Sequence, residues 1–174
     1  MVAVHTMNVP VWFLTWTAWG TWLPGDSRGW KHRRQGNQTA RVALANWHHA
    51  RLSHSPCEFN PQHRTVIANA LIEHAQFRNW KVYLLTVRSN HLHLLLAANC
   101  NAQIVRDSLK ARATRMLRVA FPQFTDRPVW TRGGDVETVD DEVAFHGIRR
   151  YILEHDWPED VFVDVPWTRG LFAN

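Results

Sequence analysis

Two apolar runs separated by one tight turn constrain the fold of this chain more than any other feature. Residues 80–88 (WKVYLLTVR) and 91–98 (HLHLLLAA) each have strand composition, and Ser89-Asn90 between them favours a turn. We therefore predict an antiparallel hairpin. Side chains alternate along a strand, so the leucines of the second run point into a core. His91 and His93 then share the opposite face, about 7 Å apart along the strand.

Helical and extended patterns surround this hairpin. Apolar spacing of three and four residues predicts helices, and β-branched or aromatic runs predict strands. The elements expected in chain order are a strand at 11–19, a helix at 64–78, the hairpin, a helix at 102–120, extended pieces at 129–132 and 135–139, a helix at 142–155 capped by Asp140 and Asp141, and an irregular or short-stranded tail at 161–174. This order fits an α+β fold, a ferredoxin-like sandwich in which an antiparallel sheet has helices on one face, plus one C-terminal helix.

One segment, at about 24–61, lies outside that pattern. It opens with turn-forming Pro-Gly, continues as a polar and basic stretch at 27–38, and has room for one short helix at 39–52. We predict a single domain over residues 1–174 with this segment as a long excursion.

Composition narrows the range of partners and compartments. The 174 residues carry 20 Lys and Arg against 15 Asp and Glu, a net charge of +5. With a pI of about 9.9, the chain favours a polyanionic partner. The chain contains no run of 18 apolar residues, so no membrane span is predicted. No secretory signal is recognisable at its start. Two distant cysteines suit a reducing compartment, so we expect a cytoplasmic protein.

The histidine pair of the hairpin is the strongest candidate for chemistry. Two neighbouring imidazoles, His91 and His93, can share one divalent metal ion. The alternative is two solvent-facing histidines on an edge strand, which the H-x-H pattern alone does not exclude.

A second candidate lies on the last predicted helix. Tyr151 and His155 are one turn apart on a face that also carries Ile148 and Ile152, so both can reach one metal-bound phosphate. The alternative is a core-facing stripe with two polar residues at its margin. Tyr151 is one of two tyrosines and the only one in a mainly polar setting. The neighbouring Arg149 and Arg150 would hold phosphate or form a solvated face.

Basic residues with interleaved tryptophans form a third, distributed signal. Arg and Lys bind phosphates, and exposed Trp stacks on unpaired bases. A solvated basic surface is the alternative. The candidate DNA contacts are Arg28, Lys31, Arg33 and Arg34 in the excursion, Arg106, Lys110, Arg115 and Arg118 on the helix at 102–120, and Arg132 and Arg150 further along.

These motifs together resemble the HUH single-tyrosine transposases of the insertion-sequence 200/605 type, and most closely the transposases associated with repetitive extragenic palindromes. The resemblance covers most of residues 11–156. Its pieces are Asn90-His91-Leu92-His93-Leu94-Leu95-Leu96, Ser108-Leu109-Lys110-Ala111-Arg112 with Thr114-Arg115, Val129-Trp130-Thr131-Arg132, Arg150-Tyr151-Ile152, Trp12-Phe13-Leu14-Thr15-Trp16, and Gly20-Thr21-Trp22-Leu23-Pro24-Gly25-Asp26.

The resemblance implies that His91 and His93 bind the metal and that Tyr151 is the nucleophile. The family often adds a polar ligand one turn after the tyrosine, usually an amide, and His155 stands at that position here. The chain departs from the family pattern in two further places. Ser89 replaces a common Pro, and the Asn-Pro that often follows the tyrosine is absent.

A function follows from the same resemblance. The chain is expected to cleave and rejoin single-stranded DNA beside a hairpin through a 5′-phosphotyrosine, with Mg²⁺ or Mn²⁺, at the bacterial nucleoid. Family members usually form dimers, although palindrome-associated relatives also act as monomers, so a homodimer and a monomer are both compatible. The alternatives are a non-catalytic, domesticated nucleic-acid-binding module and a small metal-dependent hydrolase with Glu154 as the nearest carboxylate.

Overall fold

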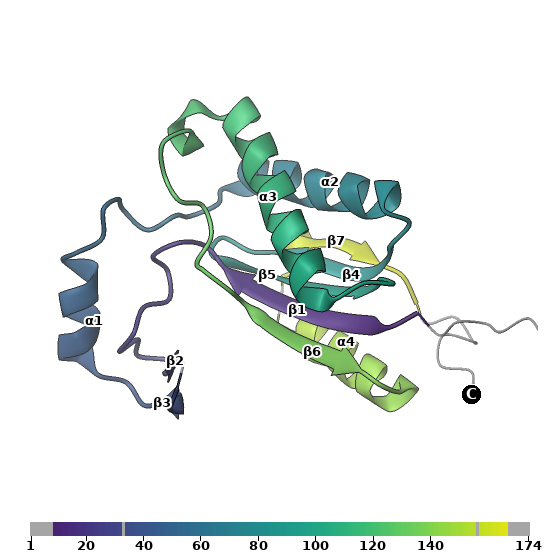
Figure 1. Cartoon of the computed structure of the whole chain (residues 1–174), viewed down its shortest axis with the longest axis horizontal. Helices are drawn as coiled ribbons and strands as arrows, with labels where there is room; N and C mark the ends of the chain where they lie inside the picture. The colour runs from purple at the N-terminus through teal and green to yellow at the C-terminus, as the bar shows by residue number, and fades with distance from the viewer. Residues whose placement is uncertain (1–8, 33, 156, 167–174) are drawn as a thin grey trace, which may run out of the picture.

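The computed structural model describes residues 9–32, 34–155 and 157–166, and its centre is a five-stranded antiparallel sheet (Figure 1). The strand order is β6-β1-β5-β4-β7. The strands are β1 (Val11–Thr17), β4 (Lys81–Val87), β5 (His91–Ala97), β6 (Asp135–Val139) and β7 (Val161–Asp164), and the helices that pack on the sheet are α2 (Pro61–Phe77), α3 (Ala102–Ala120) and α4 (Glu142–His155).

The connections confirm the predicted ferredoxin-like sandwich. The chain order β1-α2-β4-β5-α3-β6 places β5 between β1 and β4, so each half of the fold is a split βαβ unit. The predicted hairpin forms, with β4 and β5 paired from Val87–Leu92 to Lys81–Ala97. The tail contributes β7, which pairs with β4 and extends the sheet by one strand.

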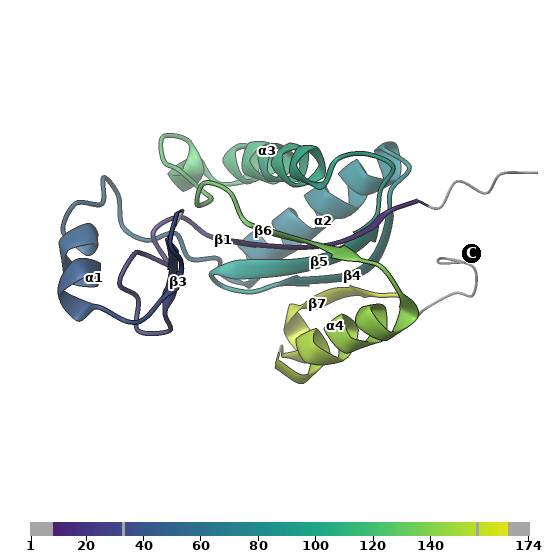
Figure 2. The ribbon, with the colours of Figure 1, turned by 60° about the horizontal axis from the view of Figure 1, so that its bottom comes forward.

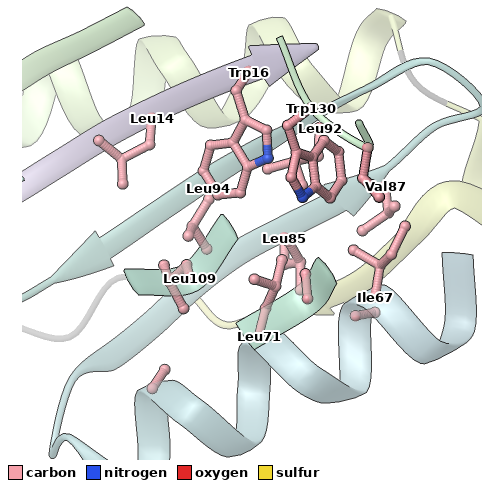
Figure 3. Close-up of a cluster of buried hydrophobic side chains, with 14 of the residues drawn as sticks. Leu14, Trp16, Ile67, Leu71, Leu85, Val87, Leu92, Leu94, Leu109 and Trp130 are labelled. Carbon is pink, nitrogen blue, oxygen red and sulfur yellow. The ribbon is translucent and has the colours of Figure 1, made fainter. Parts of the chain in front are cut away.

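The main core lies between the sheet and the two long helices. Leu92, Leu94 and Leu96 of β5 are buried on this face, as the alternation predicts. Figure 3 shows Leu92 and Leu94 facing Leu71 of α2 and Leu109 of α3. This burial holds β5 rigidly, because close-packed apolar side chains tolerate little displacement.

Helix α4 covers the opposite face of the sheet (Figure 2). Its residues Phe145 and Ile152 are buried in a smaller cluster with Tyr83, Leu84 and Leu95. His91 and His93 point to this same face, because they alternate with the leucines of the main core. The fold therefore brings the tyrosine helix and the histidine pair to one side of the sheet.

The excursion forms its own small structure beside the sheet (Figures 1 and 2). Strands β2 (Trp30–His32) and β3 (Gly36–Gln38) pair in a separate two-stranded sheet, and helix α1 (Val42–His49) follows. The predicted short helix is confirmed, but the predicted polar loop contains this hairpin. No helix in the described ranges is both long and apolar enough to cross a membrane.

Candidate active site

The two histidines of β5 lie side by side at the end of the strand. Their ring centroids are 5.0 Å apart and their planes cross at 81°. His91 Nδ1 lies 2.6 Å from the side-chain oxygen of Asn90, and His93 Nδ1 lies 3.1 Å from the hydroxyl of Thr15. Strand register explains the second contact, since Thr15 of β1 pairs directly with His93.

These contacts bear on whether the pair suits a metal ion. An amide oxygen only accepts hydrogen bonds, so Nδ1 of His91 is the donor and the lone pair of that ring is on Nε2. Metal-binding histidines usually have such a hydrogen bond on the other ring nitrogen. The donor chemistry of the pair therefore fits a divalent ion.

Tyr151 lines the same cavity as the two histidines. The cavity has a volume of about 530 Å³ and is lined by residues of β1, β5, β6 and α4, and by Thr21, Trp22 and Arg28 from the segment after β1. One face of α4 is buried, and Tyr151 lies away from it with 54% of its surface exposed. Its phenol is therefore accessible from solvent. The three residues that the resemblance implies for metal binding and nucleophilic attack thus meet in one place, although nearly sixty residues separate the tyrosine from the histidines.

His155 has a different environment. Its ring lies against the Tyr151 ring, with centroids 4.6 Å apart, and its Nδ1 is 2.7 Å from the Tyr151 carbonyl oxygen. It is not among the residues that line the cavity. Within the ranges that the structure describes, no three His, Cys, Asp or Glu side chains form a group that could hold a metal ion. The structure therefore assembles two of the three expected ligands.

Two carboxylates that we did not predict from the sequence also line this cavity. Asp135 and Glu137 of β6 reach it across β1, where Asp135 pairs with Thr15 and Glu137 with Phe13. Their alternate spacing in the extended piece at 135–139 places both on one face of the sheet. That spacing indicates a shared face from the sequence alone. Only the pairing of β6 with β1, however, places the two carboxylates at this cavity. Carboxylate oxygens are donors that Mg²⁺ and Mn²⁺ prefer, but in the described part of the chain neither residue completes a three-ligand group with the histidine pair.

Helix α4 is tied to the rest of the molecule near its C-terminal end. The buried carboxylate of Asp160 contacts Arg64 of α2 and lies 3.6 Å from Arg88, which follows β4. Arg88 also donates to the carbonyl oxygen of His155, the last residue of α4. Arg88, in the turn that leads into the histidine strand, therefore links that turn to the helix that carries Tyr151.

The predicted DNA contacts fall at separate places on the molecule. Arg28 and Arg132 line a second cavity that adjoins the first. Arg115 and Arg118 line a small cavity on the outer side of α3, and Arg150 lies on the outer face of α4, where Arg149 instead pairs with Asp164. Nothing is described for the side chain of Lys31, Arg33 lies outside the described residues, and Arg34 is exposed beside β2.

Arg106 and Lys110 have structural partners. The Lys110 ammonium donates to the carbonyl oxygens of Thr131 and Gly133 at 2.6 Å, and Arg106 donates to that of Gly134. Burial, with Arg106 nearby, lowers the pKa of Lys110 to about 8. These two side chains hold the turn that leads into β6.

Comparisons with known proteins show what this chain is similar to. The family model described as "Transposase IS200 like" matches residues 56–155. A solved structure of a proposed transposase from Deinococcus radiodurans R1 is 18% identical, with 88% of this chain and 97% of that chain covered and a TM-score of 0.45. A tyrosine transposase associated with repetitive extragenic palindromes, solved bound to its hairpin, is 11% identical, with 97% and 94% covered and a TM-score of 0.50.

The second of these structures shows the same fold as this chain. The search of curated proteins found no match to this chain. The family model spans more than half of the residues and includes the hairpin, both histidines and Tyr151. The chain therefore belongs to the IS200-like transposase family.

Proposed function

We propose that this transposase cleaves and rejoins single-stranded DNA with Tyr151 as its nucleophile. The observation that carries the proposal is the single cavity that Tyr151 shares with His91 and His93. Tyr83 is buried within the sheet and cannot take this part.

In the proposed reaction the Tyr151 oxygen attacks the scissile phosphorus in line. The phenol loses its proton, a P–O bond forms to the tyrosine, and the P–O3′ bond breaks. The leaving oxygen takes up a proton and becomes a free 3′-hydroxyl. The 5′-phosphotyrosine keeps the phosphodiester energy, so a second 3′-hydroxyl can displace the tyrosine without ATP.

His91 and His93 would hold the divalent ion, for which we propose Mg²⁺ or Mn²⁺. Such an ion polarises the phosphate and stabilises developing negative charge. Asn90 and Thr15 orient the two imidazoles. We propose His155 as the third ligand, because it stands one turn after Tyr151, where the resemblance implies a polar ligand. Ligation would require the His155 ring to turn into the cavity.

The proposed substrate is single-stranded DNA beside a hairpin. The hairpin-bound relative with the same fold and the basic charge of this chain both support it. We propose phosphate contacts from Arg28, Lys31, Arg33, Arg34, Arg115, Arg118, Arg132 and Arg150, whereas Arg106 and Lys110 position the turn before β6. One chain holds the histidines and the tyrosine together, so a monomer can act alone at the nucleoid.

A non-catalytic DNA-binding module is the second candidate. The observation that favours it is the lack of a three-ligand metal group in the described part of the chain. A domesticated transposase that had lost catalysis would keep the fold and the basic surface.

The deciding experiment is incubation with labelled single-stranded hairpin DNAs and Mn²⁺, followed by a denaturing gel. We expect a slower protein–DNA band for the wild type and none for Tyr151→Phe. The matched control is Tyr83→Phe. The Tyr83 hydroxyl is buried and has no hydrogen-bond partner among the described residues, so its removal should be well tolerated. An adduct that persists in Tyr151→Phe would refute the assignment. Binding on a native gel with no adduct from any hairpin would favour the binding module.

A further inference from the structure

Residues 20–56, between the first strand and the second helix, lie outside the hydrophobic core, whereas Ala18, Cys57 and Phe59 at their margins belong to it. No described residue from 20 to 56 has a buried hydrophobic side chain, and helix α1 buries none of its residues. The same segment contains six Arg or Lys and one acidic residue, a net charge equal to the +5 of the whole chain. Because this segment is structured and basic but does not build the core, we interpret it as a binding element for a polyanion.

This segment encloses a second cavity next to the candidate active site. The cavity has a volume of about 790 Å³, within the usual size of ligand sites. It lies between the β2–β3 hairpin, the end of β1 and the turn before β6. The two cavities share five lining residues, so a strand bound at the first can continue into the second: Thr15, Thr17, Trp22, Arg28 and Asp135.

Trp22 presents a fixed aromatic ring where the two cavities meet. It is 43% exposed, yet its indole N–H donates to the Gly29 carbonyl at 2.7 Å. The Arg28 guanidinium lies 5.0 Å from the ring centroid and is itself held by two hydrogen bonds to Asp26. An exposed ring held in one orientation is a stacking platform for an unpaired base.

Polar groups suited to a base edge and a phosphate line the same cavity. Asn37 of β3 is exposed, and its amide can both donate and accept. The neighbouring Gln38 has its amide nitrogen within hydrogen-bond distance of the carbonyl oxygens of residues 35–37, so its side-chain oxygen is the part available as an acceptor. Arg132 is exposed at the opposite wall and has no ion-pair partner within the described ranges.

We propose that this second cavity binds one unpaired base of the DNA strand beside the scissile phosphate. The base stacks on Trp22, Asn37 hydrogen-bonds its edge, and Arg132 contacts the adjoining phosphate. The excursion is thereby the part of this transposase that selects the sequence next to the cleavage position. The inference rests on the proposed function for its substrate, single-stranded DNA.

The test measures binding without cleavage. A 20-nucleotide DNA is selected from a random single-stranded pool on the Tyr151→Phe protein, and its affinity is measured by fluorescence anisotropy with each position made abasic in turn. We expect Trp22→Ala to weaken binding of the intact strand roughly 5- to 150-fold. At one abasic position, that loss should disappear, because the base that stacks is already missing.

Three comparisons guard against a merely structural effect. Trp47→Ala is the matched control. Trp47 lies on α1, is half-exposed with the Arg51 guanidinium over its ring, and lines neither cavity. This substitution should leave affinity within about twofold. Trp22→Phe keeps an aromatic ring and should retain most of the affinity. Asn37→Ala should change the preferred base at the position that the abasic scan identifies.

Several results would overturn the inference. The first is that Trp22→Ala lowers the affinity equally at every abasic position, or does not lower it at all. The second is that Trp47→Ala lowers the affinity as much as Trp22→Ala. The third is that no sequence is enriched from the pool. Because no adduct is needed, a failure of the proposed tyrosine chemistry leaves this result standing. A normal adduct with unchanged Trp22→Ala binding would refute only the base site.

Discussion

His63 has to remain neutral to perform its part in the folded chain. It is the third residue of α2, and its Nδ1 accepts a hydrogen bond from the Asn60 backbone N–H while Asn60 accepts one from His63. A protonated imidazole has no acceptor. Burial lowers the pKa of His63, in agreement with that requirement.

This arrangement predicts an acid-sensitive stability. The unfolded chain takes up the proton at the ordinary histidine pKa, above the folded value, so the free energy of unfolding should fall as the pH drops below about 6.5. Urea unfolding at pH 7.5 and 5.5 should show this loss in the wild type and a smaller one in His63→Gln. Glutamine completes the same capping box without titrating. His74, whose pKa burial also lowers, accounts for a remaining slope. Equal slopes would contradict the assignment.

We predict different roles for Lys110 and Arg115, two basic residues of one helix. Lys110→Met removes both hydrogen bonds to the turn before β6, and should reduce stability by about 1–3 kcal/mol. Arg115→Ala removes an exposed charge. It should change stability by less than about 0.5 kcal/mol and reduce the salt dependence of single-strand binding by about 0.7 in logarithmic slope. Thermal unfolding and a salt titration measure both effects, and a reversed pattern would make Lys110 the phosphate contact.

At the scale of elements, the position of α4 depends on a buried charge. Asp160 is 3% exposed and contacts Arg64, so Asp160→Asn leaves a largely buried guanidinium without its counter-charge. We expect a loss of about 3–5 kcal/mol in stability and faster amide exchange along α4. Asp164→Asn is the control, because its pair with Arg149 is half-exposed and is worth at most about 1 kcal/mol. Unchanged exchange in α4 would show that its apolar contacts hold it alone.

At the scale of the whole molecule, the β2–β3 hairpin should be separable from the fold. The chain leaves and returns at one point, where Arg41 N–H donates to the Gly25 carbonyl at 2.9 Å. Replacing residues 26–40 with a Gly-Gly-Ser linker removes no buried hydrophobic side chain that the structure describes. We expect the melting temperature to stay within about 4 °C. The replacement removes four basic residues, so the salt slope of single-strand binding should fall by up to about 3. Calorimetry measures the melting temperature and a salt titration measures the slope. A large drop in the melting temperature would show that the hairpin is required for the stability of the fold.

Local patterns in the chain were sufficient for most of the elements. The limits of α3 and α4 match the prediction, because spacing and capping residues act within one or two turns. The shared face of His91 and His93 followed from the alternation of a strand. The β2–β3 hairpin was missed, because its three-residue strands carry no apolar alternation for a pattern to show.

The assembly of the site could not be derived from those patterns. Tyr151 meets the histidines because α4 packs on the sheet face opposite α2 and α3, and Asp135 and Glu137 reach the same cavity because β6 pairs with β1. His155 lies outside the cavity although it is one turn from Tyr151. Sequence by itself determined which residues form helices and strands and which face each residue occupies, because these depend on neighbours along the chain. Tertiary structure alone decided which faces meet, because that depends on contacts between segments far apart in sequence.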